Sequence, residues 1–435
     1  MVNIVEKGNT IQEIVKRGLC IGCGTCAVLC PNNALTITEC HQTGTYLPQL
    51  DYSKCNRCGI CLKICPGSEV DFNKLNLTFF NQKPRNQFVG NYIKCYSGYA
   101  TDQNVRCKSA SGGLITALST FALEDHIVDG ILTTRATAQK PLRPNSFIAR
   151  TEEEVNSAVG SKYCPVPVNS SINKILENQG RYIIIGLPCH IQGLRKAQII
   201  NNKLKNRISL VFGIVCNHTP TFHATDFLLK KLRISKEKVT KLDYRSKDWP
   251  GGINITVGDC WKHFIPFSSS YYWGYVFQKF FWSKRCMICD DKLCQLADII
   301  FMDPWLPRFS SDRMGSSLVA VRSKKGEEFI AKALEKGVVK LQTISIDEVL
   351  RSQKMATTIR SAAARSYVLK YPSKNSLMFQ KTKPAPSILD LLEAFHLVSI
   401  NNIYRKDSKL SQLMIDLHAK LWDFARFAKR VLTKI

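Results

Sequence analysis

Short apolar runs alternate with segments of helical periodicity through the middle of the chain, and this alternation predicts the fold of that region. The apolar run 181–186 ends in a glycine and leads into a helical pattern from about residue 189. The apolar run 208–216 is likewise followed by a helical pattern over 220–232. Strands that alternate with helices are typical of a sheet covered on both faces. The pattern therefore predicts an α/β domain over residues 91–344.

The rest of this domain follows the same pattern. Helices are expected over 111–126 and 324–336. Further strands are expected at 128–134, 239–245, 253–258, 297–303, 317–322 and 338–344. The pattern does not require every pair of strands to be parallel.

The two ends of the chain differ from the middle. Residues 1–85 are rich in cysteine, and short strands are expected at 34–40 and 45–51, which together predict a small α+β domain. Within and just after it, residues 67–90 are polar and rich in Asn and Gln, and we interpret them as a linker. Over residues 345–435 the pattern is helical and basic, which predicts a helical extension.

The last part of this extension is amphipathic. Lys and Arg occupy much of its polar side. The apolar positions expected near one face are Leu413, Ile415, Leu417, Leu421, Phe424, Phe427, Val431 and Leu432. A helix that packs on the body of the protein and a helix that lies at a membrane surface both fit this pattern.

Eight cysteines near the N-terminus form two copies of one spacing, C-x2-C-x2-C-x3-C-P. In bacterial ferredoxins this spacing holds two 4Fe-4S clusters, and the fourth cysteine of each run binds the cluster of the other run. One cluster is therefore expected on Cys20, Cys23, Cys26 and Cys65, and the other on Cys55, Cys58, Cys61 and Cys30. Zinc does not explain the fourth cysteine before a proline, and disulfides require an exported chain.

Composition narrows the setting. A chain of 435 residues is long enough for two or three domains. No stretch approaches 18 uninterrupted apolar residues, and the first residues lack the apolar core of a signal peptide. Eighteen cysteines in such a chain favour metal binding in a reducing compartment over disulfides. We therefore expect a cytoplasmic protein.

The formal charge of +27 suggests acidic partners. Three clusters of charge about −2 would leave about +21. Attraction to an acidic ferredoxin or redox subunit, attraction to an anionic membrane surface, and a basic proteome background all fit this excess. Peripheral contact with the inner face of the membrane through the C-terminal helix is one expectation from it. No nucleic-acid motif accompanies the charge, so nucleic-acid binding is not expected.

Two segments of the middle region have features of a phosphate-binding site. The segment SASGG, residues 109–113, precedes a helix, and its small residues leave backbone N–H groups that could face a pyrophosphate. In GSKYCPV, residues 160–166, Lys162 could pair with a phosphate or with the pyrimidine edge of a flavin. Helix capping and a solvated lysine are the alternatives. The candidate cofactor-binding residues are Ser109, Ser111, Gly112, Gly113, Ser161 and Lys162.

Four more cysteines occupy suggestive positions. Cys189 lies at a strand-to-helix turn and Cys216 ends the next predicted strand, so both are expected at the same edge of the sheet. Cys286 and Cys289 form a C-x2-C pair. Together they would supply four thiolates for a third 4Fe-4S cluster. Inert buried cysteines and a zinc site remain alternatives.

Other residues near these motifs have weaker indications. Cys294 is a spare candidate ligand, and His190 and His218 are more often hydrogen-bond donors behind a ligand than ligands themselves. The cysteines that we interpret as structural are Cys40, Cys95, Cys107, Cys164 and Cys260.

With these motifs in place, the chain resembles the coenzyme F420 hydrogenase/dehydrogenase beta-subunit family over about residues 1–350. The resemblance rests on the two cysteine runs and on KSASGGLITAL, VGSKYCPV, YIIIGLPCHIQGLRK, FGIVCNHTP, LDYRSKDWPGG and RCMICDDKLCQLADIIFMDPW. It implies an α/β core that binds FAD at the SASGG and GSKY segments and holds an additional 4Fe-4S cluster. This chain departs from the family at Met302, where glycine is usual, and a side chain there could crowd a cofactor and affect Asp303.

The resemblance implies an iron–sulfur flavoprotein oxidoreductase. It would couple one-electron transfer through 4Fe-4S clusters to hydride transfer at FAD, with a deazaflavin coenzyme or another organic substrate, in either direction. The alternative is an electron-transfer subunit that relays electrons to a catalytic partner, with a link to surface-polysaccharide synthesis as in many bacterial relatives. An assembly factor with vestigial centres is disfavoured by the intact set of cysteines. The catalytic residues stay unassigned, and His190, His218 and Asp303 are the polar candidates for proton transfer.

Overall fold

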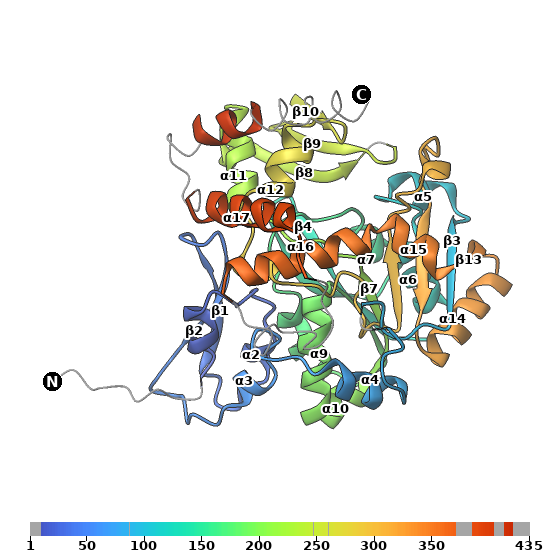
Figure 1. The fold of residues 1–435 in the computed structure, drawn as a ribbon. Helices are drawn as coiled ribbons and strands as arrows, with labels where there is room; N and C mark the ends of the chain where they lie inside the picture. The colour runs from blue at the N-terminus through green and yellow to red at the C-terminus, as the bar shows by residue number, and fades with distance from the viewer. Residues whose placement is uncertain are drawn as a thin grey trace.

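An eight-stranded mixed sheet forms the centre of the computed structural model, which describes residues 10–86, 88–246, 248–259, 261–370, 385–403 and 413–420. The strand order is β13-β3-β12-β11-β7-β6-β4-β5 (Figure 1). The strands are β3 (Lys94–Ala100), β4 (Gly130–Thr137), β5 (Lys140–Ala149), β6 (Tyr182–Gly186), β7 (Ile208–Ile214), β11 (Ile299–Met302), β12 (Ser317–Val321) and β13 (Val339–Ile344). The central strands β4, β6, β7 and β11 are parallel neighbours, and the pairs toward both edges are antiparallel.

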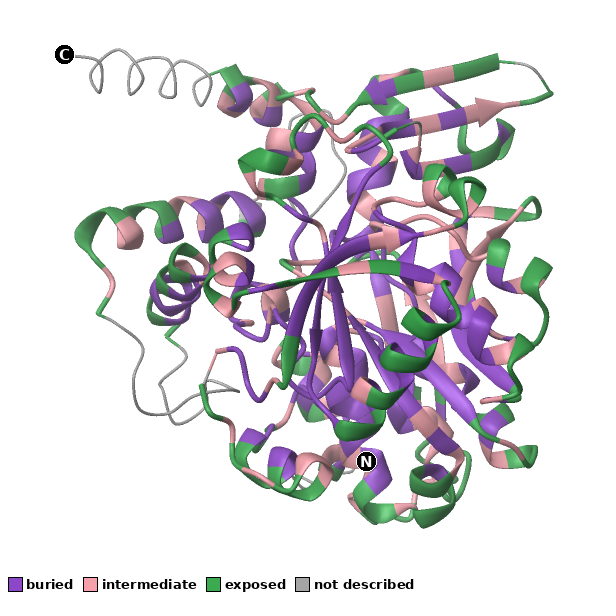
Figure 2. Cartoon of the chain, turned by 90° about the vertical axis from the view of Figure 1, so that its right-hand side faces the viewer, coloured by how far each residue is buried: buried purple, intermediate pink, exposed green. Residues whose placement is uncertain are grey.

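Alternate residues of the central strands enter two separate cores, as expected for a sheet covered on both faces. Ile183 and Phe212 pack with residues of α6 (Leu114–Glu124) and α14 (Lys324–Glu335). Their neighbours Ile184 and Val211 pack on the other face, with residues of α9 (Pro188–Ile200). Figure 2 shows these strands buried and the exposed residues on the surrounding helices and loops.

Most expected elements of the central domain are confirmed, within a few residues at their ends. Two strands of the sheet, β3 and β5, were not expected from the sequence. The β5 segment contains Pro141 and Pro144, which argue against a central strand, but β5 lies at the edge of the sheet where proline is tolerated. The β3 segment KCYSGYA has no continuous apolar run, although most of its residues are buried.

Two of the expected strands belong to a different sheet. The segments at 239–245 and 253–258 form β8 (Val239–Ser246) and β9 (Gly252–Val257), which pair with β10 (Trp261–Pro266). These three strands form a separate antiparallel sheet at the top of Figure 1. The sequence pattern located the first two strands but did not reveal that they leave the main sheet.

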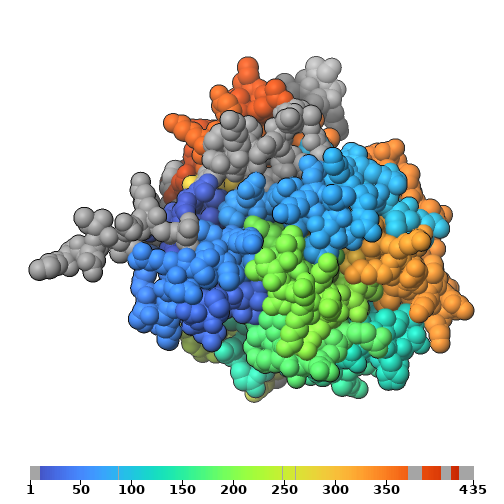
Figure 3. Space-filling view, turned by 90° about the horizontal axis from the view of Figure 1, so that it is seen from below, coloured from blue at the N-terminus to red at the C-terminus, as the bar shows by residue number. Residues whose placement is uncertain are grey.

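The N-terminal domain is small and contains one antiparallel strand pair, β1 (Leu35–Cys40) with β2 (Thr45–Leu50). Its short helices are α1 (Gln12–Lys16), α2 (Thr25–Val28) and α3 (Ile60–Lys63). The domain is docked firmly on the central one. Buried Asn169 donates from Nδ2 to the Thr25 hydroxyl at 2.7 Å and to the His190 carbonyl at 2.8 Å. Figure 3 shows the blue N-terminal residues lying against the green residues near 190–210.

The interpretation of residues 67–90 as a linker is wrong in part, because they contain helix α4 (Phe72–Phe80). The Asp71 carboxylate caps this helix by accepting from the backbone N–H of Lys74. Phe72 and Leu75 are buried, and the amide of the fully buried Asn76 donates to the carbonyl of Phe72. The polar composition hid these two apolar anchors and the satisfied asparagine.

The C-terminal extension is helical where it is described, with α15 (Ile346–Ser352), α16 (Met355–Val368) and α17 (Ile388–Ile403). Residues 413–420 are also helical, and there Ile415 is buried whereas Leu413 and Leu417 are exposed. These three residues therefore do not share one face, contrary to the expectation. The other five apolar positions expected on that face lie outside the described residues. No described helix is long and apolar enough to span a bilayer.

Candidate functional site

Four cysteines of the N-terminal domain come together around one buried point. We call Cys20, Cys23, Cys26 and Cys65 the inner set. Burial raises the pKa of all four thiols. The charges of Cys23, Cys20 and Cys65 raise the pKa of Cys26 further, because the four sulfur atoms are neighbours. The last cysteine of the second run thus lies with the first three of the first run.

The remaining four N-terminal cysteines surround a second point nearer the surface. We call Cys30, Cys55, Cys58 and Cys61 the outer set, and all four line one small pocket. Burial raises the pKa of Cys61, and the charges of Cys58 and Cys55 add to this effect. Cys58 is exposed to solvent, which no cysteine of the inner set is.

Backbone N–H groups face the sulfur atoms of both sets. Gly22 donates to Cys20 Sγ at 3.4 Å, Gly67 to Cys65 Sγ at 3.2 Å and Ala34 to Cys30 Sγ at 3.3 Å. Gly22 has a φ of +66°, and a Cβ there would lie 2.5 Å from the carbonyl oxygen of Tyr46. This turn therefore requires glycine. Such N–H···S contacts stabilise negative charge on sulfur.

A third group of four cysteines forms in the central domain from three distant segments. We call Cys189, Cys216, Cys286 and Cys289 the core set. Cys189 lies at the start of α9, just after β6, and Cys216 follows β7, the parallel neighbour of β6, so both lie at the carboxyl edge of the sheet. Burial raises the pKa of Cys189 well above its ordinary value, and the charges of the other three raise it further. The pKa of Cys289 rises to about 12.

Sets of four thiolates are known to hold either a single zinc ion or a 4Fe-4S cluster. Zinc needs its ligands about 2.0–2.3 Å from one centre. A cubane distributes four thiolates over four irons, and its iron supplies the positive charge that buried thiolates need.

A large cavity adjoins the core set. Its volume is about 1300 Å³, and Cys189, Cys216 and Cys286 line it. The N-terminal turn of α6 and the segment 158–166 line it as well. A cavity of this size exceeds the roughly 300–1,000 Å³ of typical small-molecule sites. It has room for a dinucleotide cofactor and part of a second molecule.

The N-terminus of α6 opens into this cavity without a cap. Gly113 occupies the capping position with a φ of 76° and, as a glycine, has no side chain that could accept from the first turn. Leu114, Ile115 and Thr116 line the cavity, and first-turn N–H groups have no acceptor within their own helix. The helix dipole adds partial positive charge at this end. These features fit the pyrophosphate of a dinucleotide.

The SASGG residues have more varied roles than the sequence suggested. Ser109, Ser111 and Gly113 line the cavity, as does Ser161. The Ser109 hydroxyl donates to the carbonyl of Val105 at 2.7 Å, and the Ser111 hydroxyl donates to the carbonyl of Ser316.

Gly112 has a packing role instead. Its N–H donates to the Ser317 hydroxyl at 2.9 Å. A Cβ there would lie 2.7 Å from the carbonyl oxygen of Gly98. This glycine therefore allows two backbone segments to approach closely, and its N–H is not available to a ligand.

Lys162 lines the cavity and is not a freely solvated lysine. Its ammonium donates to the carbonyls of Ala158, Val159 and Gly160. Burial lowers the pKa of Lys162 to about 8. The lysine therefore carries a positive charge at pH 7 and loses it in mildly alkaline solution.

The structure adds a buried arginine that the sequence did not reveal. Arg245 lies near the end of β8 and lines the cavity. Its Nη1 lies 3.1 Å from Asp303 Oδ2, and its Nη2 donates to the carbonyl of Ala110 at 2.8 Å. Among the described residues, its buried Nε has no acceptor. Arg245 is the arginine of the LDYR segment. Its approach to SASGG could not be predicted, because it depends on the separate sheet of β8–β10.

Aromatic rings form another wall of the cavity that spacing did not reveal. Phe267 stacks on Trp305 with ring centroids 5.3 Å apart, and its centroid lies 5.1 Å from that of Trp273. The indole N–H groups of Trp249 and Trp273 are buried without an acceptor among the described residues. These rings come from segments between residues 249 and 305, where aromatic residues are dense in the sequence.

The C-terminal extension supplies a further wall through α16. Thr357, Thr358, Ser361 and Arg365 of this helix line the cavity. Arg365 Nε donates to the carbonyl of Met287 at 2.6 Å, between the two cysteines of the C-x2-C pair. Its charge also faces Cys289 and Cys286.

The two candidate histidines are neutral at pH 7 because burial lowers their pKa. The pKa of His190 falls to about 4, and its Nδ1 accepts from the N–H of Leu187 at 3.2 Å. The pKa of His218 falls to about 3, and its Nε2 donates to the carbonyl of Phe277 at 2.6 Å. Both line the cavity, but neither is poised to donate a proton. Asp303 lines it too and is paired with Arg245.

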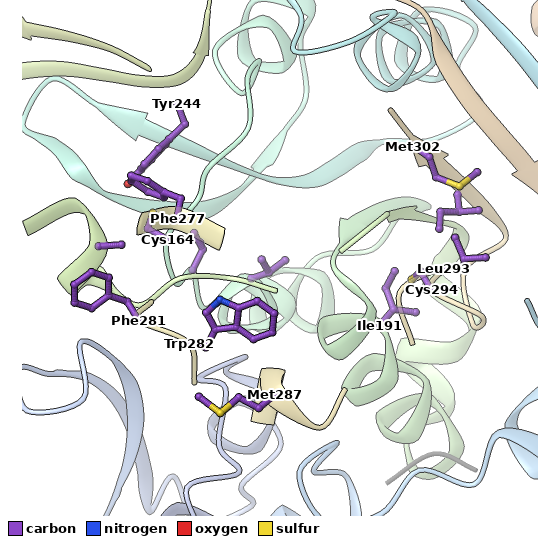
Figure 4. Close-up of a cluster of buried hydrophobic side chains, with 14 of the residues drawn as sticks. Cys164, Ile191, Tyr244, Phe277, Phe281, Trp282, Met287, Leu293, Cys294 and Met302 are labelled. Carbon is purple, nitrogen blue, oxygen red and sulfur yellow. The ribbon is translucent and has the colours of Figure 1, made fainter. Parts of the chain in front are cut away.

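The remaining sequence candidates are placed as follows. Met302 is buried and lines the cavity, so a side chain does occupy space there. Cys294 is fully buried in the hydrophobic core, near Ile191 and Leu293 in Figure 4, and does not line the cavity. Cys95 and Cys164 are buried, Cys40 is half-buried and Cys107 is exposed. Cys260 lies outside the described residues.

Comparisons with known proteins agree with this architecture. The family model for the C terminus of the coenzyme F420 hydrogenase/dehydrogenase beta subunit matches residues 179–347, and the corresponding N-terminal model matches 95–173. A 4Fe-4S dicluster domain model matches 19–68.

Similar curated proteins carry related names. The coenzyme F420 hydrogenase subunit beta of Methanothermobacter thermautotrophicus is 26% identical over 64% of this chain and 96% of its own length. That of Methanococcus voltae is 29% identical over 60% of this chain and 87% of its own length. The coenzyme F420-dependent sulfite reductase of Methanocaldococcus jannaschii is 26% identical over 79% of this chain and 50% of its own length.

A solved structure shares the fold. A chain of the F420-reducing [NiFe] hydrogenase complex from Methanosarcina barkeri matches with a TM-score of 0.50 and 21% identity, over 65% of this chain and 95% of that chain. The two halves of the beta-subunit model together span most of the central domain, and the dicluster model spans all eight N-terminal cysteines. The chain therefore belongs to the coenzyme F420 hydrogenase/dehydrogenase beta-subunit family, a family of oxidoreductases, and carries a 4Fe-4S dicluster domain.

Proposed function

We propose that this chain is an iron–sulfur flavoprotein oxidoreductase that couples one-electron transfer at 4Fe-4S clusters to hydride transfer at FAD. A deazaflavin coenzyme or another organic substrate would be the reaction partner. One observation carries the proposal. A single cavity of about 1300 Å³ extends from the uncapped N-terminus of α6 to three cysteines of the core set.

We propose the inner, outer and core sets as the ligands of three 4Fe-4S clusters. The inner and outer sets follow the crossed pattern that the spacing predicts, and the dicluster model covers both. The core set is supported by the mutual approach of its four half-buried cysteines near the carboxyl edge of β6 and β7.

The lining of the cavity offers partners for each part of FAD, and this supports the proposal. The first-turn N–H groups of α6 and the ammonium of Lys162 provide positive charge for its pyrophosphate. Arg245 Nε offers a donor to a carbonyl or phosphate oxygen. When bound, FAD would exchange electrons in pairs with an organic molecule and singly with a cluster.

The chain's own residues would orient the reactants and exclude water. The rings of Phe267, Trp273 and Trp305 provide an apolar wall against which a flat substrate can stack. His190, His218 and the ion pair of Arg245 with Asp303 form the polar part of the cavity lining, and their hydrogen bonds hold these side chains in place. We assign no catalytic acid, because the two histidines are neutral at pH 7 and Asp303 is paired with Arg245.

The second candidate is an electron-transfer subunit without a substrate of its own. Its support is the exposure of Cys58 in the outer set, which suits electron exchange with an acidic ferredoxin or a redox subunit. Relatives of this chain are named as subunits of coenzyme F420 hydrogenase. Such a subunit would need no FAD, so flavin content separates the two candidates.

The test is an anaerobic titration of the fully reconstituted protein with reduced coenzyme F420. FAD and iron are counted on the same sample, and absorbance and EPR follow the flavin and the clusters. We expect one FAD and about twelve irons per chain. Reduction of both kinds of centre within seconds supports a deazaflavin oxidoreductase. Full cofactor content without reduction points to another organic substrate, and absence of FAD overturns the proposal in favour of the electron-transfer subunit.

A further inference from the structure

Arg285 is a buried cation without a carboxylate partner among the described residues. It belongs to α13 (Lys284–Met287), directly precedes Cys286, and only 1% of its surface is exposed. Its Nη2 donates to the carbonyl of Pro66 at 3.4 Å and to Gln192 Oε1 at 3.1 Å. Its Nε and Nη1 are also buried and have no acceptor in the described structure. Burying a charge in this way is costly unless something compensates it.

The surroundings of Arg285 identify what compensates it. On one side, Pro66 directly follows Cys65 of the inner set. On the other side, Cys286 is its neighbour in sequence, and the Arg285 charge lowers the pKa of the Cys189 and Cys289 thiols against the effect of burial. The guanidinium thus lies between two sets of four cysteines that belong to different domains.

We propose that Arg285 is the positive link between the inner and core clusters, in which Nη2 binds the Pro66 carbonyl and the remaining N–H groups donate to sulfur of the core cluster. This inference rests on the proposed core cluster. Donors to sulfur and nearby positive charge favour the reduced, more negative state and so raise the reduction potential. With both clusters bound, Arg285 would favour the state in which the core cluster holds the electron and the inner cluster is oxidised. Such a one-electron exchange would involve no bond or proton transfer.

Gln192 holds Arg285 in this orientation. It is fully buried on α9, and its Nε2 donates to Asp291 Oδ2 at 2.7 Å while its Oε1 accepts from Arg285. The chain Asp291, Gln192, Arg285, Pro66 therefore joins the two domains through polar contacts, and the orientation of the guanidinium does not depend on the clusters themselves.

The test is an EPR-monitored redox titration of the fully loaded holoprotein and its Arg285→Met variant. Iron is counted first. The matched control is Lys284→Met. It also removes one positive charge, but Lys284 is only partly buried and is the residue before Arg285. We expect Arg285→Met to disfavour the reduced core cluster at least tenfold, about 59 mV for a one-electron couple. Lys284→Met should shift it less than threefold, because solvent screens that charge.

The outcomes separate this inference from the proposed function. About eight irons in the wild-type holoprotein would mean that the core cluster, and with it the proposed function, is wrong. Twelve irons with a core potential that shifts no more in Arg285→Met than in Lys284→Met would overturn the role of Arg285 alone. If Arg285→Met does not take up the core cluster, Arg285→Gln is titrated and judged by the same criterion. Loss of the core cluster from both variants would also overturn the inference, because Arg285 would then be a structural support.

Discussion

The N-terminal cysteine sets and the core set are built in opposite ways. The inner and outer sets come from two short runs of sequence wound on tight turns, one of which requires Gly22. The core set comes from three segments spread over residues 189–289, which meet only because β6 and β7 are parallel neighbours. The first kind of site is encoded locally, whereas the second exists only once the sheet has formed.

The two kinds of site also stabilise negative charge differently. Backbone N–H groups of Gly22, Ala34 and Gly67 face sulfur in the N-terminal sets. The core set is flanked instead by the guanidinium groups of Arg285 and Arg365. A backbone N–H is kept in every substitution except one to proline, whereas a side-chain cation is lost in most substitutions. The environment of the core set is therefore the easier one to tune by substitution.

Removing one ligand of the core set should have the largest effect. We expect Cys286→Ala to lose about four of about twelve irons per chain, while the eight N-terminal irons remain. Iron analysis with EPR of the reduced protein measures this. Cys294→Ala is the matched control, because Cys294 is buried nearby in the sequence but does not line the cavity. Loss of N-terminal irons from Cys286→Ala would show that the sites are not independently encoded.

Unlike a backbone N–H group, the ammonium of Lys162 can lose its proton, so FAD affinity at the cavity should depend on pH. Burial lowers the pKa of Lys162 to about 8. If its ammonium binds FAD phosphate, FAD affinity should fall about tenfold per pH unit above 8. Fluorescence titration of FAD between pH 7 and 9.5 measures this, and Lys162→Met should give weaker binding with little pH dependence over the same range. Equal slopes for the two proteins would remove Lys162 from the site.

In the apoprotein, the contribution of Lys162 to the free energy of unfolding should change with pH in the direction opposite to FAD affinity. The ordinary pKa of lysine is 10.5, so between about pH 8 and 10.5 the unfolded chain binds more protons than the folded one. The contribution of Lys162 to stability therefore rises with pH across this window. Denaturant unfolding measures the free energy of unfolding of the wild-type and Lys162→Met apoproteins at several pH values. The difference between the two slopes against pH is the contribution of Lys162.

Exposure predicts which cluster is lost first in air. The outer set includes exposed Cys58, whereas Cys23, Cys26 and Cys65 of the inner set are buried. We expect thiols of the outer set to become reactive severalfold sooner than those of the inner set. Alkylation followed by mass spectrometry during timed oxygen exposure measures the order. Simultaneous release of all eight N-terminal thiols would contradict the distinction between outer and inner sets.

The smallest effect tests the contact between the two domains. Thr25 is buried, its hydroxyl accepts from Asn169 at 2.7 Å and it lies 3.3 Å from Cys23 Sγ. Thr25→Val should reduce the free energy of unfolding by about 1–3 kcal/mol, because it leaves one of the two N–H bonds of the buried Asn169 amide without an acceptor. Thr78→Val on an exposed face should change it by less than about 0.5 kcal/mol. Denaturant unfolding compares the two variants. Equal small decreases in the free energy of unfolding would mean that this contact contributes little to stability.

The sequence predicted those features that depend on local spacing. The central strands, the helices that follow them and the grouping of the eight N-terminal cysteines could be proposed from short patterns, whereas the core set had to be proposed from the order of the expected strands. The edge strand β5 was missed because its prolines oppose a strand, and α4 was taken as a linker because polar residues surround its two anchors. Arg245, Arg285 and the aromatic wall were missed because their partners are distant in sequence. Gly112 was assigned to a ligand, although its missing side chain serves the contact between two backbone segments.

Helix α16, which forms one wall of the cavity, lies outside the part of the chain that matches the family. The matched family region ends at residue 347, yet Thr357, Thr358, Ser361 and Arg365 of α16 complete the enclosure beside Cys286. A chain cut after residue 347 would keep all twelve cysteines of the three sets but would lose this wall of the cavity. The segment after the matched region therefore shapes the chamber without contributing a cysteine to any set.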